Sequence, residues 1–213
     1  MDKVRILCFG DSYTRGYIPW TDHERFSETI RFPKKLQELL GLKSEIIEEW
    51  LNSRTLTSED KRPGKEGRNG SSYLIPCIDT HDPLDLIVLM LWTNELKHSF
   101  ENEPEYIGML LEKLFVKVIL GRKSQFKEKY PQVLIISLPI INDKTEYAWE
   151  RYIGAASKSQ QLTNIYAKIA EKNNCYFVDA SSLMVGIDGV HFTKESHIKL
   201  AEMICKKIES ITF

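Results

Sequence analysis

Five short, almost continuously apolar runs recur along the chain and restrict its fold more than any other feature of the sequence. They cover residues 4–9, 45–51, 84–92, 133–138 and 175–178. Runs of this length that are rich in β-branched residues are typical of strands buried on both faces, as in a parallel sheet. The sequence therefore predicts five strands that form one parallel sheet.

Apolar residues between and after the later runs repeat every 3.6 residues, which predicts helices. Three such segments cover residues 107–119, 162–170 and 198–208. Parallel strands need crossover connections, and helices that supply them cover both faces of the sheet. The alternation predicts a doubly wound α/β fold, and we expect residues 1–213 to form a single domain.

The composition is that of a globular chain, with 213 residues, 42% hydrophobic and 28% charged. Its 29 basic and 30 acidic residues give a formal net charge of -1. This balance gives no electrostatic reason to expect nucleic acid or an anionic membrane surface as a partner. We therefore expect a small, neutral substrate molecule, and the oligomeric state stays open, a homo-oligomer included.

The four cysteines, Cys8, Cys77, Cys175 and Cys205, stand far apart without a CxxC pair, which argues against a disulfide framework. The longest apolar run, residues 86–92, is too short to cross a bilayer, and no stretch resembles a signal peptide. No HExxH or paired-cysteine pattern indicates a metal. We expect a cytoplasmic protein with no metal or other cofactor.

The stretch ILCFGDSYTRGY places Ser12 directly after the first apolar run. Ligands of doubly wound sheets bind beyond the carboxyl ends of the strands, so a serine at this point is a candidate nucleophile. Its hydroxyl needs a base that removes its proton. Taken alone, Asp11 and Ser12 are better explained as residues that cap a helix or stabilise a turn.

The stretch GIDGVHF offers the base, because Asp188 stands three residues before His191 in a loop that follows the fifth run. A turn through Gly189 would bring the carboxylate to Nδ1 of the imidazole and leave Nε2 for the serine proton. An isolated DxxH is more often an Asx turn beside a packed histidine. The other histidines lack such an acid and are interpreted as surface or capping residues. They are His23, His81, His98 and His197.

Acyl transfer also needs hydrogen-bond donors for the developing oxyanion. LWTNELK places Asn94 after the third run, and LNSRT places Ser53 after the second. The Asn94 side chain and the backbone N–H groups of Ser53 and Ser12 are the candidate donors. Asn94 alone is equally well explained as a helix cap. Candidate groups after four of the strands favour one shared reaction over chance turn chemistry.

The blocks FGDSYTRGY, WTNE and DGVHF resemble, in this order, blocks of the GDSL-like, or SGNH, hydrolases. NGSSYLIPCIDTHDPLDLIVLML and KSQQLTNIYAKIAEKNNCYFVDA are similar to the arylesterase and acyl-CoA thioesterase-like branch. The resemblance implies a three-layer α/β/α, flavodoxin-like fold and a metal-independent serine hydrolase. Ser12 would be the nucleophile, His191 the base and Asp188 its orienting acid. Ser12, Ser53 and Asn94 would form the oxyanion hole.

The chain departs from this family pattern at Ser53 and Trp92, where glycine is usual. Serine keeps the backbone N–H, but its Cβ constrains φ and crowds the oxyanion. Trp92 either ends the third strand as a core aromatic or sets its ring against the acyl pocket. The second alternative predicts that only short acyl groups fit. Asp11 and Trp149 are further candidates for the substrate pocket.

Two connections, residues 57–70 and 140–159, are too long for ordinary loops and are predicted to form rims of a binding site. The basic residues of the first are Lys61, Arg62, Lys65 and Arg68. We interpret this basic stretch as a solvated loop, because no phosphate-loop motif accompanies it. A phosphate-holding role, as on a coenzyme A thioester, is the alternative.

Together these features predict a serine hydrolase that cleaves a small acyl ester or thioester through a Ser-His-Asp triad, of the carboxylesterase, arylesterase or deacetylase type. The alternative is a catalytically impaired protein of the same fold that binds a small molecule or a carbohydrate. The substitutions at Ser53 and Trp92 would then have removed the activity.

Overall fold

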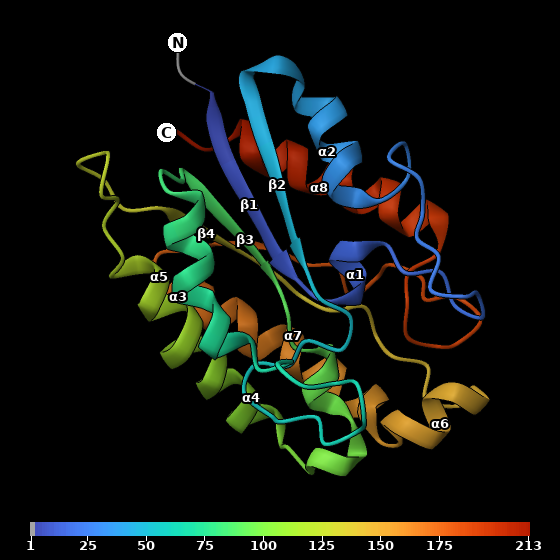
Figure 1. Ribbon diagram of the computed structural model, residues 1–213. Coiled ribbons are helices and arrows are strands. Elements are labelled where there is room, and N and C mark those ends of the chain that lie inside the picture. The colour runs from blue at the N-terminus through green and yellow to red at the C-terminus, as the bar shows by residue number, and fades with distance from the viewer. Residues whose placement is uncertain (1–2) are drawn as a thin grey trace.

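The strands form one parallel sheet in the order β2-β1-β3-β4-β5 (Figure 1). The computed structural model describes residues 3–213. The strands are β1 (Val4–Gly10), β2 (Ser44–Trp50), β3 (Leu86–Met90), β4 (Gln132–Ile136) and β5 (Tyr176–Val178). The five predicted strands are confirmed. The strand order reverses direction between β1 and β3, which is where sheets of this kind bind ligands.

Helices cover both faces of the sheet and give the molecule three layers (Figure 1). On one face α2 (Phe32–Leu40) packs against α8 (Lys194–Glu209). The opposite face carries α3 (Gly70–His81), α4 (Pro104–Leu111), α5 (Lys117–Leu120) and α7 (Ala155–Lys172). The short elements are α1 (Ser12–Arg15), α6 (Glu146–Tyr152), the 3-10 helices η1 (Gly41–Lys43), η2 (Thr93–Leu96) and η3 (His98–Phe100), and the π-helical η4 (Glu112–Val116). In the part of the chain that the structure describes, none of these helices is long and apolar enough to cross a membrane.

The central strands β1 and β3 are buried on both faces of the sheet, as their apolar sequences predict. Every residue of β3, with the sequence LIVLM, is buried. In β1 the last five residues are buried as well. Continuous apolar sequence is what a strand covered by helices on both sides needs. The segments that follow these two strands therefore start from fixed points in the core.

Two boundaries differ from the sequence prediction. The third strand ends at Met90, two residues before the end of the apolar run, because the chain turns into η2 from Thr93. The helix predicted over residues 107–119 is continuous, but η4 inserts a π turn between α4 and α5. The apolar periodicity predicted which face of this helix is buried, but it did not predict that one turn of the helix contains an extra residue.

His197 is buried in the first half of α8, with 1% of its surface exposed, which corrects its interpretation as a surface or capping residue. Its ring lies 5.2 Å from that of Phe26 and 5.5 Å from that of Phe192, measured between centroids, and stacks on Phe32. Nδ1 has no hydrogen-bond partner among the described residues. Burial, helped by the nearby His191, lowers the pKa of His197 to about 3.

We expect this buried histidine to make the protein sensitive to acid. The pKa of His197 falls from 6.5 to about 3 on folding, so between these values only the unfolded chain takes up the proton. The associated stability is fully present above pH 6.5 and is lost as the pH falls toward 3. At pH 5 the loss is roughly 2 kcal/mol. Urea unfolding at pH 7 and pH 5 should show a drop larger by this amount in the wild type than in His197→Leu.

The exposed His98 supplies a control for this experiment. His98→Leu should keep the pH dependence of the wild type, because His98 is solvated in both the folded and the unfolded chain. Identical pH dependence of unfolding in the wild type and His197→Leu would contradict the buried, neutral state of His197.

Candidate functional site

The turn after β1 places Ser12 at the carboxyl edge of the sheet. A Cβ at Gly10 would lie 2.6 Å from the carbonyl oxygen of Met90, so the strand can end here only with a glycine. Asp11 caps α1, its Oδ1 accepting a hydrogen bond from the N–H of Tyr13 at 3.0 Å. Ser12 is the first residue of α1 and is 8% exposed. The capping interpretation of Asp11 and the strand-end position of Ser12 are both correct.

Ser12, His191 and Asp188 form a continuous chain of hydrogen bonds. Ser12 Oγ lies 2.9 Å from Nε2 of His191, and Nδ1 of His191 lies 2.5 Å from Oδ2 of Asp188. Oδ1 of Asp188 accepts two backbone N–H groups of its own loop, at 3.0 and 2.9 Å. The loop turns at Gly189, whose φ is +75° and whose Cβ position lies 2.2 Å from the carbonyl oxygen of Asn142. The predicted turn therefore exists, and only glycine fits it.

The electrostatics of this chain favour an ionised Asp188. Burial by itself would raise the pKa of Asp188, but the hydrogen bond from His191, the His191 charge and the two backbone N–H groups outweigh it and lower the pKa. The carboxylate holds the imidazole proton on Nδ1. Nε2 is then left to accept a proton from Ser12.

Aromatic side chains hold the His191 ring in place. The centroid of the ring lies 4.8 Å from that of Tyr17, 5.8 Å from that of Tyr13 and 6.4 Å from that of Tyr147. The hydroxyl of Tyr13 donates a hydrogen bond to the carbonyl oxygen of Val190. This contact ties α1 directly to the loop that carries the histidine, so the Ser12–His191 geometry is fixed from both sides.

Ser12 and His191 open onto a cavity of about 190 Å³. Its lining consists of Ser12, Tyr17, His23, Asn52, Ser53, Arg62, Lys65, Asn94, Lys97, Tyr147, Arg151, Tyr152 and His191. Four of the predicted site residues thus meet here, while Asp188 lies behind the imidazole. Both connections predicted as rims, residues 57–70 and 140–159, contribute side chains to the wall.

Two residues of this lining, Ser12 and Ser53, carry backbone N–H groups that are not used elsewhere in the described residues. Ser53 follows β2 with a φ of 67°. This left-handed conformation costs a residue with a Cβ about 1–2 kcal/mol, whereas glycine adopts it freely. Glycine would therefore adopt the backbone of this turn more easily than the serine that is present.

Asn94 is 4% exposed and held by three hydrogen bonds. Its Nδ2 donates to the carbonyl oxygen of Arg54 at 3.0 Å and to Oδ2 of Asp11 at 3.2 Å, while its Oδ1 accepts from the Tyr152 hydroxyl at 3.3 Å. Burial raises the pKa of Asp11 to about 6, against the opposing effect of its bond from Tyr13 and of nearby cations. Donation by Asn94 to a substrate therefore requires release of the longer contact, that to Asp11.

The three residues predicted for the substrate pocket do not line the cavity, and this part of the prediction is corrected. Asp11 is fully buried beneath it. Trp92 is fully buried as well, with its ring 4.4 Å from that of Tyr166, so it is a core aromatic. Trp149 is 59% exposed on the outside of α6. The size restriction predicted from Trp92 loses its basis.

Sequence reasoning missed several residues of the wall and its support. Tyr17 and Lys97 line the cavity. Buried Glu95 accepts hydrogen bonds from the backbone N–H groups of Thr57 at 2.8 Å and of its neighbour in the chain at 3.1 Å. Glu95 therefore anchors the 57–70 connection beside Asn94. The signal was the position of Glu95 and Lys97 directly after the third strand.

The residues that could hold a metal lie outside the cavity. Glu49, Cys77 and His81 place their ligand atoms within 4.8 Å of one another. Nε2 of His81 is 2.8 Å from Oε1 of Glu49, and burial raises the pKa of Cys77 to about 12. None of the three lines the cavity with Ser12.

A family model described as GDSL-like lipase/acylhydrolase matches residues 6–204. The chain belongs to this family. The match includes β1 from Ile6 onward, the other four strands, and the hydrogen-bonded chain of Ser12, His191 and Asp188. A comparison with curated proteins gives no significant match.

Solved structures agree with the family. The native aryl esterase of M. smegmatis is 34% identical, with 98% of this chain and 99% of that chain covered and a TM-score of 0.88. A carbohydrate acetylesterase from Sinorhizobium meliloti is 31% identical, with 99% and 100% covered and a TM-score of 0.89. A G-D-S-L family protein from Veillonella parvula, 15% identical over 97% and 99% with a TM-score of 0.66, shares the fold. The predicted SGNH hydrolase fold is confirmed, and this GDSL family protein is a carboxylic ester hydrolase.

Glycine at position 53 should relieve the left-handed strain and keep the backbone N–H. We expect Ser53→Gly to raise the free energy of unfolding by up to about 1 kcal/mol, because the relief is partly offset by the greater freedom of glycine in the unfolded chain. Urea unfolding at neutral pH measures the change. Ser53→Ala, which keeps the Cβ, is the matched control and should stay within about 0.5 kcal/mol of the wild type. Destabilisation by Ser53→Gly would show that this turn is not strained.

Proposed function

We propose that this GDSL family protein is a serine hydrolase that cleaves small acyl esters with Ser12 as nucleophile, His191 as general base and Asp188 as the orienting acid. The observation that carries the proposal is the unbroken chain of hydrogen bonds from Asp188 through His191 to Ser12, which opens onto the cavity. Nucleophile, base and orienting group in hydrogen-bond contact are the parts that acyl transfer by a serine requires.

In the first half of the reaction, Ser12 Oγ attacks the carbonyl carbon of the ester while its proton passes to Nε2 of His191. Asp188 stabilises the imidazolium that forms, through the bond to Nδ1. His191 then gives the proton to the alkoxide leaving group, and an acyl group remains on Ser12. In the second half, water attacks the acyl carbon while it loses a proton to the same histidine. The bond from the acyl carbon to Ser12 Oγ then breaks, Oγ takes the proton back from His191, and the acid leaves.

Three donors are available for the tetrahedral intermediate: the backbone N–H groups of Ser12 and Ser53 and the Asn94 side chain. The first two have no other protein acceptor among the described residues, so they are preorganised at no cost in broken bonds. Asn94 exchanges its 3.2 Å contact with Asp11 for the oxyanion. Because that exchange follows the appearance of negative charge on the substrate oxygen, Asn94 contributes mainly to the transition state.

The substrate class follows from the cavity and from the similar structures. A space of about 190 Å³ suits a small ester better than a long-chain lipid. The similar structures include an aryl esterase and a carbohydrate acetylesterase, and an acetyl group is a short acyl group. Trp92 does not fill the acyl site, so its presence gives no reason to assign an impaired binding protein.

Loss of the nucleophile should abolish turnover. We expect Ser12→Ala to reduce hydrolysis of p-nitrophenyl acetate to background while the protein stays folded, because no other hydroxyl contacts Nε2 of His191 in the described structure. A fluorophosphonate probe should label the wild type on Ser12, as peptide mass spectrometry can verify. Asp188→Asn should keep more activity than His191→Ala. A Ser12→Ala protein with the wild-type rate, or an unlabelled wild type, would refute the assignment.

Asn94 should affect kcat rather than KM. We expect Asn94→Ala to lower kcat by roughly 10²–10³-fold with little change in KM, the effect of removing one donor from an oxyanion hole. Steady-state kinetics with p-nitrophenyl acetate gives both constants. Asn52→Ala, which removes a neighbouring amide of the same cavity wall, tests whether any lost amide has this effect. Unchanged kcat and a raised KM for Asn94→Ala would make it a substrate-binding residue instead.

A further inference from the structure

Four cationic side chains line the cavity onto which the Ser12 hydroxyl opens. They are Arg62, Lys65, Lys97 and Arg151. The chain as a whole has a formal net charge of -1, so this concentration of positive charge is local. From it we propose that the natural substrate is an ester that carries an anionic group, which these side chains hold while Ser12 attacks. This inference rests on the proposed function and specifies its substrate class.

Asp60 is the carboxylate that offsets part of this charge. Arg62 binds it through two contacts, Nε to Oδ1 at 2.8 Å and Nη2 to Oδ2 at 2.5 Å. Nζ of Lys97 lies 3.2 Å from the same Oδ2. The hydrogen bond from Arg62 outweighs burial and holds the pKa of Asp60 well below its ordinary value. One negative charge therefore faces two positive charges.

The other two cations have weaker partners or none. Arg151 pairs with Glu150, whose side chain is 57% exposed, and its guanidinium lies 4.5 Å from the centre of the Tyr147 ring. Lys65 forms no ion pair with any residue that the structure describes. Burial and two neighbouring arginines lower the pKa of Lys65. An exposed pair such as that of Arg151 offsets little charge, so the wall keeps a positive excess.

The residues of the basic stretch have different surroundings. Lys61 and Arg62 are exposed, as expected for a solvated loop. The guanidinium of Arg68 donates to the backbone carbonyl oxygens of Asn52 and Glu66, as expected for an arginine that holds a loop together. Arg62 and Lys65 also line the cavity.

The positions of the cations also indicate where the anionic group of the substrate would lie relative to Ser12. Arg62, Lys97 and Arg151, together with the single acidic residue Glu150, line a second hollow of about 270 Å³, which Ser12 and His191 do not line. Burial is the main cause that lowers the pKa of Lys97 to about 8, and repulsion by the charge of Arg62 adds to it. A bound anion would relieve this repulsion. The geometry assigns the anionic group to the side of the cavity that faces this second hollow.

Matched esters with and without a charge test the proposal. One set carries the charge on the leaving alcohol: 4-acetoxybenzoate and 4-acetoxybenzenesulfonate, against the neutral methyl 4-acetoxybenzoate. The other carries it on the acyl group: mono-4-nitrophenyl glutarate against its methyl ester. Each kcat/KM is divided by the rate constant of hydroxide-catalysed hydrolysis, which removes differences in intrinsic reactivity. We expect a preference of about tenfold for the anionic member of at least one set, which falls when salt screens the charges.

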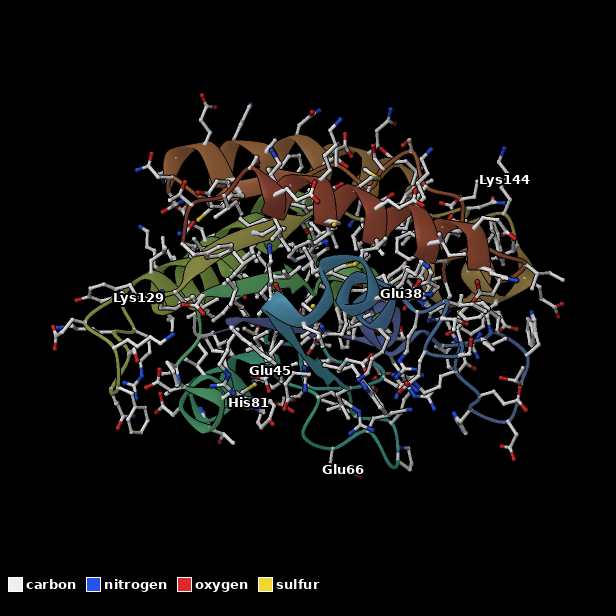
Figure 2. All side chains as sticks on the ribbon, turned by 90° about the horizontal axis from the view of Figure 1, so that it is seen from above. Glu38, Glu45, Glu66, His81, Lys129 and Lys144 are labelled. Carbon is white, nitrogen blue, oxygen red and sulfur yellow. The ribbon has the colours of Figure 1, made fainter. Side chains whose placement is uncertain are left out.

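Substitutions on the rim then assign the preference to the cations. Lys65→Gln combined with Arg151→Gln should lower the anionic-to-neutral ratio of kcat/KM at least fivefold, and neither change leaves a buried carboxylate unpaired. Lys61→Gln on the same loop and Lys144→Gln are the matched controls. Both lysines are exposed, and Lys144 points away from the body of the molecule (Figure 2). The control variants should keep the wild-type ratio.

The results separate failure of this inference from failure of the proposed function. Hydrolysis of neutral esters with no preference for the anionic members would overturn the anionic substrate and leave the serine hydrolase intact. A preference that the double variant keeps would also overturn it. If no ester of either kind is cleaved and the fluorophosphonate does not label Ser12, the proposed function is wrong and the substrate class falls with it.

Discussion

The hydrogen bond between Ser12 and His191 joins residues 179 positions apart in the chain, and the site exists only where the fold makes that bond possible. Ser12 follows β1 inside the sheet, and His191 lies in the loop after the edge strand β5. The two positions come together across β3 and β4, so all the intervening strands must be paired. The contact from Tyr13 to Val190 closes the same gap. The candidate site therefore depends on a fully paired sheet.

The features of the site that could be predicted from the sequence are contacts between residues close together in the chain and positions set by the geometry of a parallel sheet. Asp188 and His191 are three residues apart, and one tight turn at Gly189 suffices to join them. The carboxyl ends of parallel strands lie at one edge, so Ser12 and Asn94 could be expected near each other before any contact was known. The five strands were predictable from the apolar runs, because a strand that is buried on both faces has an almost continuously apolar sequence.

The direction of a side chain beyond a strand end was not predictable. Trp92 lies after β3, where the regular alternation of the strand has stopped, and its ring packs on Tyr166 from α7. The burial of His197 was likewise not predictable, since histidine is common on surfaces. The rings that pack against it, Phe26 and Phe32, come from a distant part of the chain. In each case the decisive neighbour belongs to another element, which local pattern does not identify.

The net charge of the chain did not predict the cationic wall of the cavity for a related reason. A sum over the whole chain does not show which charged side chains lie close together in the fold. Two buried acids hold the 57–70 connection in place, yet they differ in what they bind. Glu95 accepts only neutral donors, from Thr57, Ser58 and Asn102, and offsets no cation. Of these two acids, Asp60 is the one that pairs with cations of the wall, Arg62 and Lys97. The contacts that fix this loop therefore also leave the positive excess that faces the cavity.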